Sequence, residues 1–183
     1  MTSFRHFLVD TEAAEVAELA VVLPILFTLI FAIFSFGRAY NVYATVTRAA
    51  QEGARVAVTP ACATCTTFTC GGTGSFYPCD ATVAKAVTDA MKASNVDTSA
   101  TRIVASSAPT VTSCNPPQPS RPCSQTNNIH VCRGVVLNSS SSTHPQACGT
   151  VVQFQYDYQF LPIPFVPSIT RHMTARGQMW MEY

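Results

Sequence analysis

Eight cysteine residues carry the most evident chemistry of this 183-residue chain. They all lie after residue 61: Cys62, Cys65, Cys70, Cys79, Cys114, Cys123, Cys132 and Cys148. Paired cysteines form disulfides, which persist in an oxidising compartment. Unpaired cysteines can bind zinc, or exchange thiols when two of them have the spacing of Cys62-x-x-Cys65. These three chemistries imply different proteins.

The spacing of the cysteines favours disulfides. Cys62-x-x-Cys65 has the spacing of a zinc-ligand pair, but Cys114, Cys123 and Cys132 are each separated by eight residues, without a matching pair or an H-x3-H partner. The even number predicts four bridges. We therefore predict a disulfide-bonded part that faces the periplasm or the cell exterior, with no metal site.

Other catalytic or nucleic-acid-binding patterns are missing from the sequence. It contains no HExxH, no nucleophile elbow and no βαβ pattern around Cys62-x-x-Cys65, and the four histidines have no motif spacing. The net charge of +1, without a basic cluster, argues against nucleic acid as a partner. We expect no catalytic residue and no cofactor.

One apolar segment precedes all the cysteines. Residues Leu19 to Gly37 contain no charged side chain, and their length matches a hydrocarbon core about 30 Å thick. Apolar residues occupy every side of the helical wheel, unlike a surface helix. The preceding residues are acidic and no A-x-A site follows, which argues against a cleaved secretory signal. We predict a retained single span of the inner membrane.

The helical pattern continues beyond this span. Small and apolar residues recur every three or four positions as far as Val58, and Pro60 ends the pattern. A helix from Ala14 to Val58 is about 65 Å long. Pro24 lies within the span, where it removes one backbone hydrogen bond and should loosen the helix.

Residues 59–183 are predicted to form a cysteine-rich extracytoplasmic domain of the α+β class. A second helix is expected from Asp80, as its cap, to about Asn95. The predicted strands are Thr101–Ser106, Ile129–Leu137, Val152–Phe160 and His172–Met181; Val152–Phe160 shows strict alternation. Helix-then-strands order favours an antiparallel sheet covered by the second helix and by the end of the first.

The charges flanking the span favour the opposite orientation of the chain in the membrane. One basic residue precedes it and three follow soon after (Arg38, Arg48 and Arg55), so the positive-inside rule places the C-terminal part in the cytoplasm. The eight cysteines outweigh this count, because so many free thiols in a small cytoplasmic domain would need another purpose.

The segment from Glu18 to Val58 resembles the TadE-like family, the minor pilin-like proteins of tight-adherence (Tad/Flp) type IV pili. The resemblance rests on ELAVVLP at Glu18–Pro24, on the apolar helix, and on Gly53-Ala54-Arg55 within QEGARVAV. It implies a structural or assembly protein without catalysis. The implied partners are the inner membrane, other pilin subunits, the pilus assembly machinery and a prepilin-type peptidase.

The resemblance also implies roles for particular residues. A prepilin-type cut between Ala13 and Ala14, where the family usually has Gly before the cut, would remove a leader of residues 1–13 and make Glu18 the fifth residue. Glu18 would then meet the ammonium of a neighbouring subunit. Alternatively, Glu12, Glu15 and Glu18 simply favour the positive end of the helix dipole.

The Gly53-Ala54-Arg55 motif leaves two interpretations open as well. Its small residues permit close approach to a partner helix or to the sheet, and Arg55 can reach a carboxylate or a carbonyl group. The other interpretation is packing within the chain itself. Two further function classes remain beside the pilin-like protein: a membrane-anchored adhesin or binding module, and an anchored thiol-redox or metal enzyme.

Overall fold

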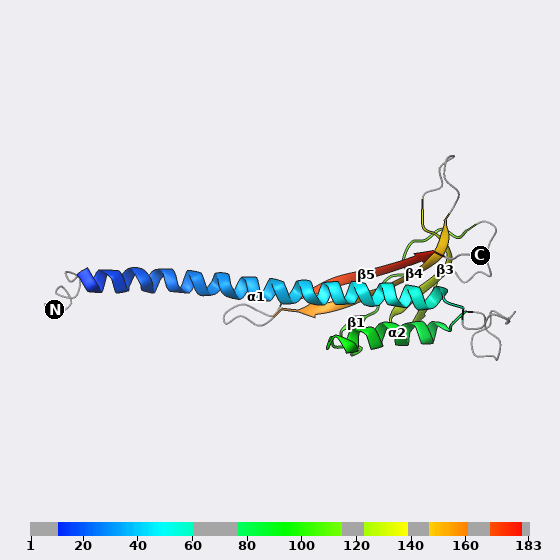
Figure 1. Cartoon of the computed structure of the whole chain (residues 1–183), viewed down its shortest axis with the longest axis horizontal. Helices are drawn as coiled ribbons and strands as arrows, with labels where there is room; N and C mark the ends of the chain where they lie inside the picture. The colour runs from blue at the N-terminus through cyan, green and yellow to red at the C-terminus, as the bar shows by residue number, and fades with distance from the viewer. Residues whose placement is uncertain (1–10, 61–76, 115–122, 139–146, 161–168, 181–183) are drawn as a thin grey trace. The chain divides into compact units, whose positions relative to one another are not determined.

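The computed structural model describes residues 11–60, 77–114, 123–138, 147–160 and 169–180 (Figure 1). These contain two helices, α1 (Thr11–Val58) and α2 (Asp80–Ala93), and five strands: β1 (Ile103–Val104), β2 (Ser124–Thr126), β3 (Ile129–Val136), β4 (Cys148–Gln159) and β5 (Thr170–Trp180). The chain divides into two compact units, Met1–Tyr40 and Asn41–Tyr183. The boundary lies within α1, so the end of this helix belongs to the same unit as the sheet.

Helix α1 forms from the periodic sequence that predicted it. It begins three residues before the predicted Ala14 and ends at Val58 as predicted, passing through Pro24. Pro60 cannot continue the helix. Thr59 satisfies carbonyl groups of the last turn, because its hydroxyl donates to the Arg55 and Val56 oxygens at 3.1 and 2.9 Å.

The sheet is antiparallel and β4 is its central strand. Strand β5 pairs with β4 along one side, whereas β3 and β1 pair with consecutive parts of the other side, and β2 pairs with β3. The four predicted strands are therefore confirmed, although the strand predicted at Val152 begins at Cys148 and the one predicted at Thr101–Ser106 is only two residues long. The α+β class is confirmed as well.

Strand β2 was not predicted from the sequence. It joins β3 through a two-residue turn, Asn127–Asn128, in which both residues have positive φ (51° and 63°), as the turn of a tight hairpin requires. The Asn128 side chain also donates to the Ile103 carbonyl at 2.8 Å, which ties the turn to β1. Asparagine tolerates this backbone conformation and can form such a bond.

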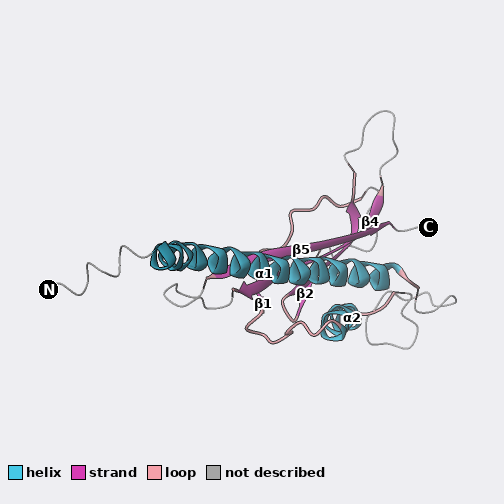
Figure 2. Cartoon of the chain, turned by 60° about the vertical axis from the view of Figure 1, so that its left-hand side comes forward, coloured by secondary structure: helices cyan, strands magenta, loops and turns pink. Residues whose placement is uncertain are grey.

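One face of the sheet is covered by helices within the second unit. A Cβ atom added to Gly53 would lie 2.4 Å from Val87 of α2 and 3.4 Å from Val152 of β4, so the end of α1 packs against both elements. The strands lie behind this part of α1 in Figure 2. The largest fully buried side chains of this face include Phe154, Met91 and Ile129. Helix α2 and the end of α1 thus cover the apolar face as predicted.

The other face carries a second, smaller apolar cluster. Buried Cys132, Val135 and Val151 are packed against Val111, Cys123 and Leu137. The segment that includes Val111 is held along this face by backbone bonds, from Cys114 to the Gly134 oxygen at 2.9 Å and from Val136 to the Thr112 oxygen at 2.8 Å. This cluster explains why Cys132 and Val135 of β3 are buried although they face away from the helices.

Candidate functional site

The first unit presents an apolar surface. The large apolar side chains of α1 from Val16 to Phe36 are between 42% and 69% exposed. This helix is long and apolar enough to cross a membrane, and none of its most apolar window is buried. A soluble protein rarely exposes a continuous apolar surface of this extent. The surface therefore needs a lipid or protein environment.

The predicted processing and assembly residues lie at the start of this helix. Ala13 and Ala14 are both within α1. Glu15 and Glu18 are exposed, and Pro24 lies farther along the same helix. A carboxylate beside an apolar surface is costly in hydrocarbon, so Glu18 requires a partner or the membrane–water boundary.

The Gly53-Ala54-Arg55 motif lies in the second unit and its residues differ in exposure. Gly53 and Ala54 are buried, Gly53 between α2 and β4. The Arg55 side chain is 69% exposed and lies 3.9 Å from Glu52, one turn earlier on α1. Gly53 therefore permits close packing within the chain, whereas Arg55 is accessible to another molecule. The two halves of the motif have different structural roles.

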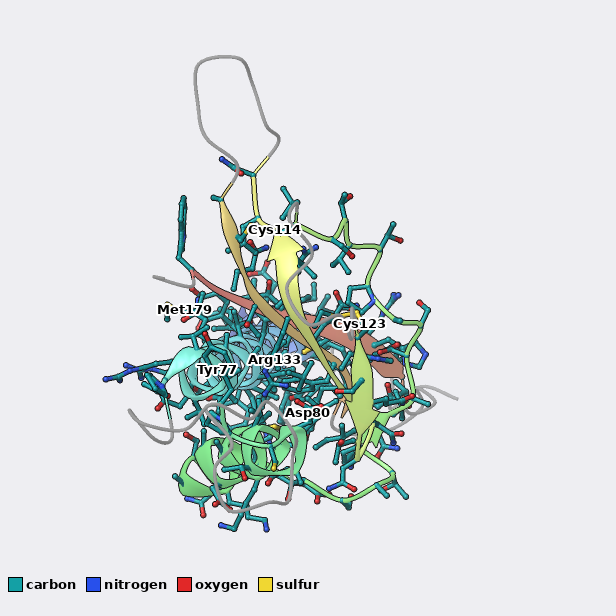
Figure 3. All side chains as sticks on the ribbon, turned by 90° about the vertical axis from the view of Figure 1, so that its right-hand side faces the viewer. Tyr77, Asp80, Cys114, Cys123, Arg133 and Met179 are labelled. Atoms are coloured by element: carbon teal, nitrogen blue, oxygen red, sulfur yellow. A yellow bond between two sulfur atoms is a disulfide. The ribbon has the colours of Figure 1, made fainter. Side chains whose placement is uncertain are left out.

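Two disulfides are present among the described residues, Cys114–Cys148 and Cys123–Cys132. Cys79 is disulfide-bonded too, whereas Cys62, Cys65 and Cys70 lie outside the described residues. The first bond joins the segment before the 115–122 stretch to the start of β4, and the second joins the residue before β2 to β3. The Cys123–Cys132 bond is part of the smaller apolar cluster, and Figure 3 labels one cysteine of each bond, Cys114 and Cys123.

Thiol labelling tests the disulfide prediction for all eight cysteines. When the protein is extracted without reductant, we expect a thiol-specific reagent to label none of the cysteines, because disulfides persist in an oxidising compartment. After reduction under denaturing conditions, mass spectrometry should count eight added labels. Full labelling without reductant, or stoichiometric zinc in the native protein, would contradict the prediction.

An acidic and a basic side chain connect α2 to the sheet. The Arg133 guanidinium on β3 contacts the Asp80 carboxylate and donates to the Pro78 oxygen at 2.8 Å, and the Ser124 hydroxyl donates to the other Asp80 oxygen. Figure 3 shows Arg133, Asp80 and Tyr77 at this junction. The prediction that Asp80 caps α2 was wrong. Cys79 is the N-cap, and Asp80 stands in the first turn, where its carboxylate binds Arg133 and Ser124 rather than the helix backbone.

The environment of this junction is partly buried. Burial raises the pKa of Tyr77, and the nearby Arg133 charge opposes that effect. The Arg133 and Asp80 side chains are only 22% and 24% exposed. An ion pair shielded in this way is costly to break, because removing one partner leaves the other charged and poorly solvated.

The Asp80–Arg133 contact should therefore contribute measurably to stability. We expect Asp80→Ala to lower the free energy of unfolding by about 2 kcal/mol, less than for a fully buried pair. The double variant Asp80→Ala/Arg133→Met should be less destabilised than the sum of the two single variants. Thermal unfolding of all four proteins measures this coupling, and strictly additive effects would show that the contact is energetically neutral.

Residues 13–55 match the model of the TadE-like protein family. This TadE-like segment contains Glu18, Pro24 and the Gly53-Ala54-Arg55 motif, so the resemblance predicted from these residues is confirmed for this segment. No curated protein and no solved structure gave a significant match to the chain. The sheet with its disulfides lies outside the matched residues.

The family match gives a general functional context. TadE-like proteins are associated with Tad pili and are generally non-enzymatic. Among the described residues, no three His, Cys, Asp or Glu side chains are grouped so that they could hold a metal ion. The TadE-like segment and the exposed apolar helix together suggest association with a membrane and with pilus components.

Proposed function

We propose that this chain is a pilin-like structural or assembly protein of a tight-adherence type IV pilus, anchored in the inner membrane by residues Leu19 to Gly37. The observation that carries this proposal is the match of residues 13–55 to the TadE-like family, on a helix whose apolar side chains are exposed. Such a surface suits lipid before assembly and neighbouring helices after it. No catalytic step is required.

The second unit would face the periplasm or the cell exterior. The disulfides Cys114–Cys148 and Cys123–Cys132 support this orientation, because reducing compartments keep thiols unpaired. The arginines that follow the span oppose it. In the proposed topology, Arg38 lies at the periplasmic surface of the inner membrane, where its long side chain can reach the lipid headgroups.

Reporter fusions distinguish the two orientations. A phosphatase that is active only in the periplasm, fused after Tyr183, should be active, and a cytoplasmic reporter at the same position should not. The reason is that oxidised cysteines and a cytoplasmic location are incompatible. Cytoplasmic activity would support the positive-inside count and would contradict the proposed topology.

Processing tests the pilin-like role directly. We expect the membrane-extracted protein to begin at Ala14, with the residues up to Ala13 removed by a prepilin-type peptidase. The measurement is intact mass combined with N-terminal sequencing, in cells with and without the peptidase. A chain that begins at Met1 in both strains, and that is absent from sheared pili, would favour an anchored protein outside the pilus.

A further inference from the structure

Strand β5 forms one edge of the sheet. It pairs with β4 through eleven consecutive residue pairs, from Gln159–Thr170 to Gly149–Trp180, without a register shift. No other described strand pairs with β5. At about 3.4 Å per residue, the strand offers an edge about 35 Å long. Figure 1 shows it running alongside the second half of α1.

The register shows which backbone groups of β5 remain available. The Phe160 amide donates to the Ile169 oxygen at 3.1 Å, so the pair next to Gln159–Thr170 is a hydrogen-bonded one. In an antiparallel pair, hydrogen-bonded and non-hydrogen-bonded positions alternate. Six residues consequently direct their amide and carbonyl groups away from β4: Thr170, His172, Thr174, Arg176, Gln178 and Trp180. No described residue bonds to these outward groups.

The common protections of an edge strand are largely missing here. Natural edge strands are short or bulged, or they carry proline or charged side chains, which prevents pairing with other chains. Strand β5 is eleven residues long, has a regular register and contains no proline, so among its own residues only the basic ones oppose pairing, and they oppose it with a basic strand. The opposite edge of the sheet differs, because β1 and β2 have only two and three residues. The long regular edge is therefore confined to β5.

The charges on β5 indicate what kind of strand would fit beside it. Arg171 and Arg176 are exposed and have no ion-pair partner among the described residues. His172 lies 2.5 Å from Asp157, which is the acidic group beside it on β4. The strand itself has no acidic residue. Opposite charges on neighbouring strands stabilise pairing, so the complementary strand is acidic.

Helix α1 carries an exposed aromatic ring on the side of the helix that faces β5. Gly177 of β5 lies against the backbone of Ala50, since a Cβ atom there would be 2.1 Å from the Ala50 oxygen. Tyr43 is seven residues before Ala50 and therefore on nearly the same side of α1. Its side chain is 47% exposed. A strand added to β5 could cover this ring with alternate apolar side chains.

A second copy of the chain does not fit this edge. Strand β5 carries Arg171 and Arg176 and has no acidic residue, so two β5 strands side by side would bring like charges together. The edges at β1 and β2 are too short to accept β5 in a head-to-tail arrangement.

We infer that the edge of β5 is a docking site for an extended, acidic segment of a different protein chain, which adds a strand to the sheet beside Tyr43. Backbone hydrogen bonds to the six outward residues supply affinity, and side chains opposite Arg176 and Tyr43 supply specificity. The inference concerns the second unit alone, so it stands or falls independently of the role of the anchor.

The test uses the full chain in detergent and a peptide of alternating valine and glutamate. Trp180 is the only tryptophan, lies on β5 and is 63% exposed, so its fluorescence reports binding at this edge. We expect a saturable blue shift. A peptide with lysine in place of glutamate should bind at least tenfold more weakly. A tenfold loss of affinity corresponds to the loss of about one charge-assisted contact.

Two variants separate strand addition from general electrostatic attraction. Thr174→Pro removes an outward amide without losing a bond to β4, so the domain should still unfold cooperatively while peptide affinity falls about tenfold. Arg176→Glu should weaken binding similarly, whereas Arg55→Glu, the same charge change on exposed α1, should not. Equal effects of the two reversals, undiminished binding by Thr174→Pro, or no saturable shift at millimolar peptide would each overturn the inference.

Discussion

Replacing Glu18 by Gln should leave membrane insertion unchanged and lower incorporation into pili by at least about tenfold. The amide keeps the size of the side chain and costs no more than a carboxylate at the membrane edge. It cannot neutralise the ammonium of a neighbouring Ala14, and an unpaired charge in an apolar environment costs several kcal/mol. Quantitative immunoblots of sheared pili and of membranes measure the two quantities separately.

Glu15→Gln is the matched control for this variant. The effect of the helix dipole decreases within the first turn. If the mature chain begins at Ala14, Glu15 is inside that turn and Glu18 is just beyond it, so a dipole effect would make Glu15→Gln the more harmful change. A neighbouring ammonium predicts the opposite order. Normal incorporation of both variants would remove the intersubunit role of Glu18.

The elements with strong periodicity could be predicted because one physical requirement dominates each of them. Residues Leu19 to Gly37 are apolar on every side of the helical wheel. In a membrane, a single segment of this kind can hydrogen-bond all its backbone groups only as a helix. In β4, Phe154, Tyr156 and Tyr158 are buried while the residues between them are more exposed, and this alternation is visible in the sequence. The boundaries differ by only a few residues.

The features that escaped prediction depend on partners distant in sequence. Asp80 looks like a helix cap, because nothing near it in the chain reveals Arg133, 53 residues later, as its partner. Strand β2 has only three residues and gives no periodic signal. Its turn residues, Asn127 and Asn128, were the available signal, since consecutive asparagines tolerate positive φ.

The candidate assembly residues were found in the sequence only through the family resemblance. Their environments then separate them, because Gly53 and Ala54 are buried within the second unit whereas Glu18 and Arg55 are exposed. A variant of Gly53 can therefore impair assembly simply by destabilising the domain. Any test of the Gly53-Ala54-Arg55 motif needs a measure of domain stability beside the measure of assembly.

Gly177→Val is the reference variant for lost domain stability. We expect it to lower the free energy of unfolding more than any other single substitution proposed for this chain. A Cβ atom at this position would lie 2.1 Å from the Ala50 oxygen and 2.6 Å from the Gln51 nitrogen, both in the backbone of α1. The backbone of a helix cannot move away from a clash by a rotamer change, as a side chain can. We expect a loss of more than about 4 kcal/mol, and a melting temperature lower by about 10 °C, measured by circular dichroism.

Other glycines of the chain supply graded controls for this prediction. Gly37→Ala adds a methyl group with no atom within 4 Å and should leave the melting temperature of the sheet unchanged. Gly53→Ala meets the Val87 side chain, which can shift, so its cost should be intermediate, about 1–3 kcal/mol. Gly53→Ala and Gly177→Val should reduce incorporation into pili in proportion to the stability they lose. Arg55→Ala should reduce incorporation while the domain keeps its full stability. That combination would show that, of these three residues, only Arg55 contacts another subunit. Equal melting temperatures for Gly37→Ala and Gly177→Val would show that α1 does not pack on β5 in this way.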